Sequence, residues 1–398
     1  MQHVILVILH KSLKSLQLVL NEFFSKLCNA LDTVSASAFT QARSKLAYTA
    51  FIELNEKGIV ESMYADNDYK SYLGHRLLAI DGSKIIVPDT PELRAEFGTV
   101  RVVNQNPQTI GYYCGAMISV CYDVLNRICL DGQIAPLKSY EVTVALKHLP
   151  GLQPNDVLLT DRGYASYFWW ATLIAKRQLF VCRCPQQSFA AVQAMFTGTI
   201  ASQIVTLYAP EKNARLIRKA GLPESITLRL VRVVLDNGTI EVLATTLLDE
   251  QKYPAASFKP LYHLRWGVET YYDIVKTRLV LENFTGKTVE SVKQDFFATL
   301  FITGLESILT DEAQAQLDER TVTNRHPQSV NRAVSFNAIK NNLLDLFYKE
   351  PDIDVLLDKL TRLFLTKPIS AQDHNKSRKR SSDGKLRRYH KYTRKISF

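Results

Sequence analysis

The sequence predicts an α/β fold, in which a mixed sheet of roughly five strands lies between helical segments. Three features of the apolar pattern support this class. Residues 1–70 carry apolar side chains at the three- and four-residue spacing of helices. Beyond residue 70, short continuous apolar runs indicate buried strands, and a helical segment separates two of them. After Pro254 the helical spacing returns, so helices are expected at both ends of the sheet.

The N-terminal region, residues 1–70, is expected to be a helical domain. Residues 12–31 and 35–60 show helical spacing, and in the second segment Arg43 and Lys45 are expected to face solvent. Only residues 4–9 of the opening segment are continuously apolar, which is too short for a membrane span. No basic residue precedes this run and no small-residue cleavage site follows soon, so a buried first helix is expected rather than a signal peptide.

The first strands of the sheet are predicted from residues 75–134. Residues 75–89 form an apolar run interrupted by Asp81-Gly82, which indicates a buried central strand followed by a turn. Residues 112–134 predict two further strands joined near residues 123–127.

The later strands alternate with helix. Residues 149–185 predict a strand, a helix near residues 167–176 and a second strand. Residues 186–250 alternate as strands do, and Asp236-Asn237-Gly238 is typical of a hairpin turn. The sequence therefore predicts a β-rich insertion between this part of the sheet and the helices that follow Pro254.

The composition excludes some kinds of site. The chain has 398 residues, 46% hydrophobic and 22% charged, so it can bury a substantial core. Its six cysteines form no C-x-x-C pair and no Cys/His group with zinc spacing. A metal–thiolate site is therefore not expected, and reduced thiols in a cytoplasmic protein are the default interpretation.

The positive charge is concentrated at the C-terminus. The net charge is +10, and the last 23 residues contain ten Lys and Arg against one Asp, or +9, so the rest of the chain carries only +1. A tail of this composition cannot bury a core, and residues 371–398 are expected to be disordered in isolation. Its Tyr389, His390 and Tyr392 suit a segment that follows a phosphate backbone and stacks on bases; the alternative is a solvated tail that aids solubility.

Two acidic residues follow apolar runs. Asp81 closes the run at residues 76–80, and Asp161 closes the run at residues 157–160. A carboxylate at the end of a buried strand is costly unless it is paired or binds a cation. The structural alternatives are an Asp that starts a turn at position 81, and a helix cap or an ion pair with Arg162 at position 161.

The segment 262–276 places four functional side chains on one helical face. Tyr262, Arg265, Glu269 and Lys276 are separated by steps of three, four and seven residues, which return to the same side of a helix. The alternative is an ordinary surface ion pair between Arg265 and Glu269, one turn apart.

Together these residues suggest metal-dependent chemistry on DNA. Mg²⁺ takes oxygen ligands, and two such ions held by about three carboxylates can drive an in-line displacement at phosphorus. The candidate ligands are Asp81, Asp161 and Glu269. The side chains suited to contact the flanking phosphates are Tyr262, Arg265 and Lys276. Arg332 and Lys340 are further candidates for DNA contacts, with a surface pair as the alternative.

The spacing Tyr262-x2-Arg265-x3-Glu269-x6-Lys276 resembles, at every position, the Y-R-E-K signature of bacterial DDE-type transposases of family-four insertion sequences. Four other blocks are similar to this family and occur in the expected order. They are residues 35–46, 77–98, 158–166 and 330–340. The resemblance therefore extends from about residue 35 to residue 340.

The resemblance implies a fold, an activity and a set of site residues. It implies an RNase H-like catalytic domain, here residues 71–370, with a β-rich insertion at about 186–250. Asp81, Asp161 and Glu269 would be the catalytic, metal-binding residues, with two Mg²⁺ ions expected and Mn²⁺ as a substitute. The activity would be cleavage at the terminal inverted repeats of an element, followed by strand transfer into target DNA.

The resemblance also implies partners and a location. The N-terminal helices would bind the DNA ends, a dimer would form on the DNA, and the protein would be cytoplasmic and associated with the nucleoid. The alternatives are a non-catalytic DNA-binding relative and an RNase H-like nuclease that cuts without joining.

One departure from the family concerns hairpin formation on the DNA end. Relatives use a Trp in the insertion to stack a flipped base, but the tryptophans of this chain are Trp169, Trp170 and Trp266. The aromatic residues that would substitute for it are Phe189, Phe196 and Tyr208.

Overall fold

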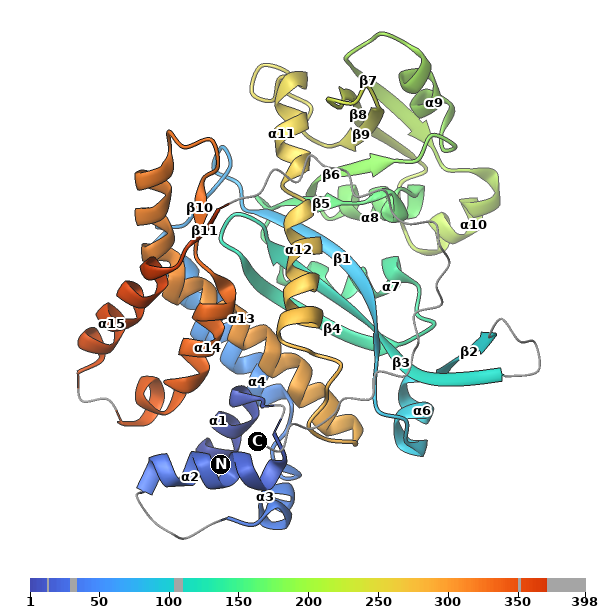
Figure 1. The fold of residues 1–398 in the computed structure, drawn as a ribbon. Helices are drawn as coiled ribbons and strands as arrows, with labels where there is room; N and C mark the ends of the chain where they lie inside the picture. Colours follow the sequence, from blue (N-terminus) through green and yellow to red (C-terminus); the bar gives the residue numbers. More distant parts are fainter. Residues whose placement is uncertain (13, 29–33, 104–109, 350–351, 371–398) are drawn as a thin grey trace. The chain divides into compact units, whose positions relative to one another are not determined.

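The computed structural model describes residues 1–12, 14–28, 34–103, 110–349 and 352–370 (Figure 1). The basic tail at residues 371–398 lies outside the described residues. The chain divides into two compact units. The first comprises Met1–Met63, Ile85–Ala116 and Val275–Phe398, and the second comprises Tyr64–Lys84 and Met117–Ile274.

The second unit contains the mixed sheet. Its central strands follow the order β4 (Ile128–Pro136), β3 (Ile110–Asp123), β1 (Leu77–Ile86), β5 (Val157–Thr160) and β6 (Leu179–Cys184). The four residues between β3 and β4 allow only an antiparallel pair, whereas β1–β5 and β5–β6 are parallel. This arrangement confirms the predicted α/β class with its mixed sheet.

The predicted insertion extends this sheet. Strand β9 (Ile240–Thr245) pairs antiparallel with β6, and β8 (Ser225–Val234) and β7 (Ser202–Tyr208) follow it. The turn between β8 and β9 contains the predicted Asp236-Asn237-Gly238 hairpin signal, with Gly238 at φ 78°. The segment also contains two helices that the alternating pattern did not predict, α9 (Ala190–Thr197) and α10 (Glu211–Lys219).

Helix α8 (Tyr167–Ala175) provides the crossover between the parallel strands β5 and β6, close to the predicted bounds. Ser166 caps it by accepting a hydrogen bond from the Trp169 amide at 3.3 Å. Trp169 and Trp170 are fully buried in the cluster that includes Leu158 and Phe180. A helix that is apolar on nearly every side must be buried, so these two indoles support the sheet.

Two local predictions were wrong. Asp81 lies inside β1, and the strand continues through Gly82 to Ile86, so Asp81-Gly82 makes no turn. The segment 262–276 is not one regular helix. It contains α11 (Phe258–His263), α12 (Trp266–Asp273) and a π-helical turn at Ile274–Arg278. A π-turn adds a residue to each turn, so the spacing counted for an α-helix does not extend to Lys276.

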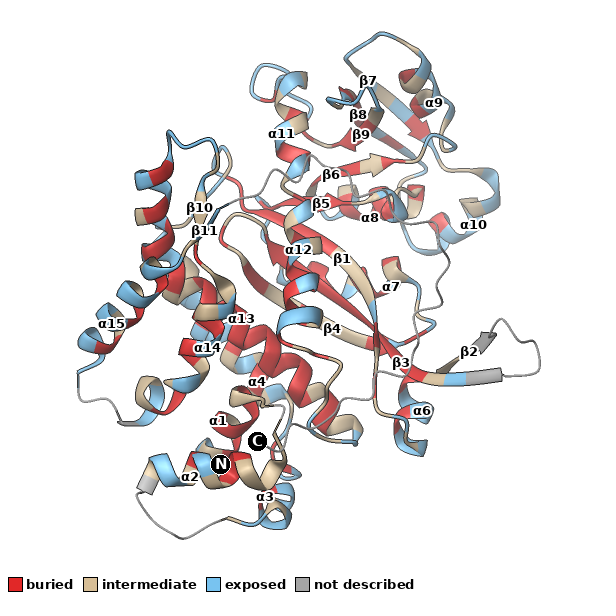
Figure 2. Cartoon of the chain, viewed as in Figure 1, coloured by how far each residue is buried: buried red, intermediate tan, exposed pale blue. Residues whose placement is uncertain are grey.

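The first unit is helical and is organised around α13 (Val289–Thr321), whose residues are mostly buried (Figure 2). Helices α1 (Gln2–His10), α4 (Thr49–Asn55) and α15 (Ile353–Thr366) pack against it. The other α-helices and strands described in this unit are α2 (Leu16–Cys28), α3 (Ala36–Arg43), α5 (Ser62–Tyr64), α6 (Pro91–Phe97), α14 (Arg332–Asn341), β2 (Thr99–Val103), β10 (Gln328–Ser329) and β11 (Ile369–Ser370), together with π-helical segments at Glu56–Glu61 and Asp345–Lys349. The predicted helical N-terminus is therefore confirmed for the described residues.

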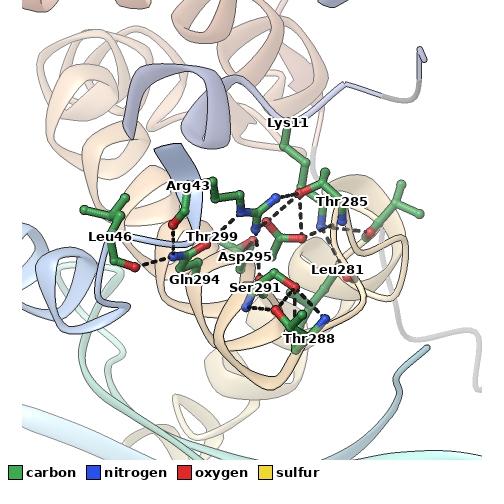
Figure 3. A network of polar contacts seen from close by, with 11 residues as sticks. Lys11, Arg43, Leu46, Leu281, Thr285, Thr288, Ser291, Gln294, Asp295 and Thr299 are labelled. Carbon is green, nitrogen blue, oxygen red and sulfur yellow. Dashed lines mark hydrogen bonds and ion pairs between the residues drawn. The ribbon is translucent and has the colours of Figure 1, made fainter. Parts of the chain in front are cut away.

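A buried polar network fixes α3 against α13 (Figure 3). Arg43 donates to Gln294 Oε1 at 2.7 Å, to Asp295 Oδ1 at 2.8 Å and to Thr285 Oγ1 at 2.7 Å. The expectation that Arg43 faces solvent was therefore wrong, while Lys45 is exposed as expected. Helical spacing alone cannot show that a charged residue has a buried partner 252 residues away. In the part of the chain that the structure describes, no helix is long and apolar enough to cross a membrane.

Candidate active site

The three carboxylates predicted as metal ligands all belong to the second unit. Asp81 lies on β1, Asp161 directly follows β5, and Glu269 is in the first turn of α12. The parallel register pairs Ala79 with Leu159. Asp81 and Asp161 each lie two residues further along, so they reach neighbouring positions on the same side of the sheet.

The Asp81 carboxylate has no cationic hydrogen-bond partner among the described residues. Its Oδ1 accepts a hydrogen bond from the Gly82 amide at 3.0 Å. Burial raises the pKa of Asp81 to about 7; the Arg265 charge opposes this shift and the Glu141 and Glu269 charges add to it. A nearby cation would favour the ionised form and so lower this pKa.

Asp161 is held by an arginine that the sequence analysis missed. Arg183 on β6 approaches Asp161 Oδ1 to 2.8 Å and Glu241 Oε1 to 2.7 Å. A single Arg inside the apolar run Leu179–Cys184 was the available signal, because a charge in a buried strand needs a partner.

Glu269 pairs with Arg265 at 2.6 Å, as the i, i+4 alternative predicted. The pair is not an ordinary surface pair, because Arg265 is only 2% exposed. Its guanidinium carbon lies over two rings, 5.8 Å from the centroid of Tyr262 and 5.6 Å from that of Trp266. Its Nε has no hydrogen-bond partner among the described residues. Arg265 therefore retains one free donor beside the carboxylates.

Two tyrosines connect α11 and α12 to the strands that carry the aspartates. Tyr262 donates to the Thr160 carbonyl at 3.2 Å, directly before Asp161. Tyr272 donates to the Asp81 carbonyl at 2.8 Å. These bonds fix α11 beside the end of β5, and α12, which carries Glu269, beside β1. The hydroxyl of Tyr262 is thereby occupied, which was not expected for a phosphate contact.

The carboxylates suit a divalent cation, although they do not form a ready-made coordination group. Among the described residues, no three His, Cys, Asp or Glu side chains lie close enough together to hold one ion as they stand. Asp161 and Glu269 are instead neutralised by arginines. The oxygen-only donor set and the half-buried Asp81 without a cation fit Mg²⁺ or Mn²⁺ better than a softer metal.

The other predicted DNA contacts lie in the first unit. Lys276 lines a cavity of about 360 Å³ whose other lining residues include Lys11 and Lys287. Arg332 lies 3.8 Å from Glu306 Oε2. Lys340 Nζ lies 3.5 Å from the Lys11 carbonyl oxygen, and burial lowers its pKa to about 8.

Of the three aromatic candidates in the insertion, only Tyr208 is largely exposed. Its side chain is 73% exposed at the end of β7. Phe189 packs against Trp170 with tilted rings whose centroids are 5.3 Å apart, and Phe196 packs against the same core.

Comparison with known proteins identifies the family. Residues 72–305 match the model described as the transposase DDE domain. The transposase InsG for insertion sequence element IS4 of Escherichia coli (strain K12) is 24% identical over 272 residues, which cover 67% of this chain and 59% of that protein. This chain thus spans less than two thirds of the length of that relative.

A cryo-EM structure of a piggyBac transposase synaptic complex with hairpin DNA is similar over 95% of this chain and 78% of that chain. The TM-score is 0.42 and the sequence identity 10%, which is too distant to support a conclusion about function. The family match covers more than half of the sequence, and the chain therefore belongs to the family of transposases with a DDE domain.

Proposed function

We propose that this chain is an insertion-sequence transposase that binds the terminal inverted repeats of a DNA element, cuts the strands at their ends and joins them to target DNA. The observation that carries the proposal is that Asp81 on β1, Asp161 directly after β5 and Glu269 on α12 belong to one unit, with the Glu269 charge acting on Asp81. All three lie inside the region that matches the family model.

Asp81, Asp161 and Glu269 would hold two Mg²⁺ ions, with Mn²⁺ as a substitute. When bound, such ions supply positive charge at the attacking and leaving oxygens of an in-line displacement. Each step exchanges one bond at phosphorus for another. The oxygen of water, or of a DNA 3′-hydroxyl, bonds to phosphorus and loses its proton, and the oxygen of the leaving strand departs.

The side chains around the carboxylates have separate roles in this proposal. Arg265 would turn its free Nε toward a phosphate flanking the scissile one, while its Nη2 orients Glu269. Lys276 would neutralise a second phosphate. Tyr262 would act as a positioning residue that fixes the strand end before Asp161, because its hydroxyl already donates to Thr160.

The remaining contacts belong to DNA binding. The N-terminal helices would recognise the repeats, and two chains would hold the two ends as a dimer on the DNA. Arg332, Lys340 and the basic residues 371–398 would add electrostatic affinity that does not depend on base sequence.

The proposal is tested with labelled element ends and purified protein in Mg²⁺, in Mn²⁺ and in EDTA. The informative variants are Asp161→Asn and Glu269→Gln, and Glu224→Gln is the matched control because its side chain is 61% exposed. We expect metal-dependent cuts at the repeat tips and joining to target DNA, both lost in the two site variants while DNA binding persists.

Other outcomes of the same experiment would contradict the proposal in different ways. Binding without cutting by the wild type in either metal would indicate a non-catalytic DNA-binding protein. Cutting without joining would indicate a nuclease on the same fold.

A further inference from the structure

We propose that Glu141 is a fourth carboxylate of this site, which binds the divalent cation together with Asp81 and Asp161, directly or through a water molecule. This inference rests on the proposed function and deepens it. Glu141 has no distinctive local feature in the sequence beyond being an acidic residue at the start of a helix.

Glu141 is positioned by a short helix on the sheet. It is the first residue of α7 (Glu141–Ala145), which follows β4 (Figure 1). Val142, Val144 and Ala145 of this helix are buried, so the helix is fixed by its apolar side chains. The Glu141 side chain itself is half-buried and lies against the chain segments that carry the two aspartates.

Two glycines show how closely Glu141 approaches these segments. A methyl group built on Gly82, the residue after Asp81, would lie 3.1 Å from Glu141 Oε1. One built on Gly163, two residues after Asp161, would lie 3.6 Å from Glu141 Oε2. Glu141 Oε1 therefore faces the segment that carries Asp81, and Oε2 faces the segment that carries Asp161. A side chain at position 82 would occupy the space that the Glu141 carboxylate uses.

The charges around Glu141 favour a cation. The Glu141 carboxylate makes no hydrogen bond or ion pair with another described residue. The Lys84 charge lowers the pKa of Glu141, and the negative charge of Asp161 raises it. The negative charge of Glu141 likewise raises the pKa of Asp81. Carboxylates gathered in a partly buried place without a compensating cation are unfavourable, and a bound divalent ion removes that repulsion.

An unpaired buried hydroxyl provides a second, independent observation. Tyr164, in the turn after Asp161, is 1% exposed, and its hydroxyl has no hydrogen-bond partner among the described residues. The groups that act on it electrostatically are Asp81, Glu141, Asp161 and Cys182, with Asp81 first. A buried hydroxyl normally has a hydrogen-bond partner. The unpaired Tyr164 hydroxyl therefore indicates that an additional oxygen-bearing group is bound among the three carboxylates.

The test measures Mn²⁺ binding to the full chain by electron paramagnetic resonance, with and without element-end DNA. The samples are the wild type, Glu141→Gln, Asp81→Asn and the control Glu224→Gln. We expect Glu141→Gln to weaken Mn²⁺ binding roughly 10- to 100-fold and the control to match the wild type. Glutamine has nearly the same shape as glutamate, and circular dichroism verifies that each variant is folded.

Two results would overturn the inference, and they are distinguishable. Unchanged Mn²⁺ affinity in Glu141→Gln together with weakened binding in Asp81→Asn would remove Glu141 from the site and leave the proposed function standing. Absence of Mn²⁺ binding by the wild type on element-end DNA would overturn the metal-dependent function as well.

A second measurement separates metal binding from a purely structural role. In cutting assays across Mg²⁺ concentrations, Glu141→Gln should need about tenfold more Mg²⁺ for half-maximal cutting and recover much of its rate at high Mg²⁺. A lower maximal rate at an unchanged Mg²⁺ requirement would argue that Glu141 only supports the fold.

Discussion

At the scale of single residues, the carboxylates of the proposed site differ in their partners. Asp161 and Glu269 are paired with Arg183 and Arg265, whereas Asp81 and Glu141 have no cation in hydrogen-bond contact among the described residues. The two unpaired carboxylates are thus the ones with most to gain from a bound cation.

Gly82 is expected to influence metal binding because it has no side chain and leaves room for the Glu141 side chain. In Gly82→Ala the new methyl group would lie 3.0 Å from Glu141 Cγ, so Glu141 must move by a few tenths of an ångström. We expect Mn²⁺ affinity to fall several-fold in a metal titration. Gly151→Ala is the matched control, because nothing lies within 4 Å of a methyl group there. Equal effects of the two substitutions would contradict this explanation.

Lys340 is expected to make stability depend on pH. Burial lowers its pKa from 10.5 to about 8 in the folded chain. Between pH 8 and pH 10.5 the unfolded chain binds more protons at Lys340 than the folded chain does. The free energy of unfolding therefore increases as pH rises through this range. Below pH 8, the cost of burying the charged Lys340 side chain is fully present. Lys340→Met should therefore be more stable at pH 7, by roughly 3 kcal/mol at most.

Urea unfolding at pH 7 and pH 9.5 measures this effect. Part of the rise in stability with pH should remain in Lys340→Met, because burial also lowers the pKa of Lys11 to about 8. A variant whose stability changes with pH as steeply as that of the wild type would show that Lys340 does not titrate in this range.

At the scale of elements, polar contacts from distant parts of the sequence hold helices in register. Arg43 on α3 and Asp295 on α13 form a buried ion pair that Gln294 and Thr285 complete (Figure 3). The two tyrosines of α11 and α12 play the same part for β5 and β1. Such contacts determine where these helices pack.

Arg43→Met is expected to destabilise the chain by about 3–5 kcal/mol, because it leaves Asp295 buried and unpaired. The free energy of unfolding in urea measures this change. Lys45→Met, two residues away and exposed, should alter it by less than about 0.5 kcal/mol. Adding Asp295→Asn to Arg43→Met should recover part of the loss; no recovery would mean that packing, not charge, causes it.

The insertion offers one exposed ring for a flipped base. If Tyr208 replaces the family's tryptophan, Tyr208→Ala should abolish hairpin ends while the first nick persists, since stacking on an aromatic ring contributes about 1–3 kcal/mol per base. Denaturing gels of the cleaved element ends show both products. Tyr208→Phe keeps the ring and should behave as the wild type; hairpins in Tyr208→Ala at the wild-type level would exclude this role.

At the scale of the whole molecule, charge is distributed unevenly along the chain. Residues 376–398 carry +9 of the net +10. A chain ending at residue 370 should therefore bind DNA more weakly, and the slope of log K against log salt should decrease by several units, at most about 8. Binding titrations at several salt concentrations measure the slope. An unchanged slope would show that the tail only solubilises the protein.

The sequence by itself determined the class of the fold and the order of most of its elements, and it predicted three carboxylates of the proposed site. Periodicity is a local property, so the helical N-terminus, the strands around Asp81 and Asp161 and the hairpin at Gly238 could be predicted from short windows. The family resemblance rested on the spacing of four residues and on four further sequence blocks. It predicted the role of Glu269 even though α11 and α12 are separate helices.

Tertiary structure decided which residues surround those carboxylates. Arg183 interrupts an apolar strand, which indicates a buried charge but not its partner, and Glu141 and Tyr164 have no distinctive local pattern. All three become neighbours of the aspartates only when β1, β5, β6 and α7 pack together. The same holds for Arg43, whose burial depends on Asp295. Burial and pairing depend on contacts between residues far apart in the sequence, and no local pattern contains that information.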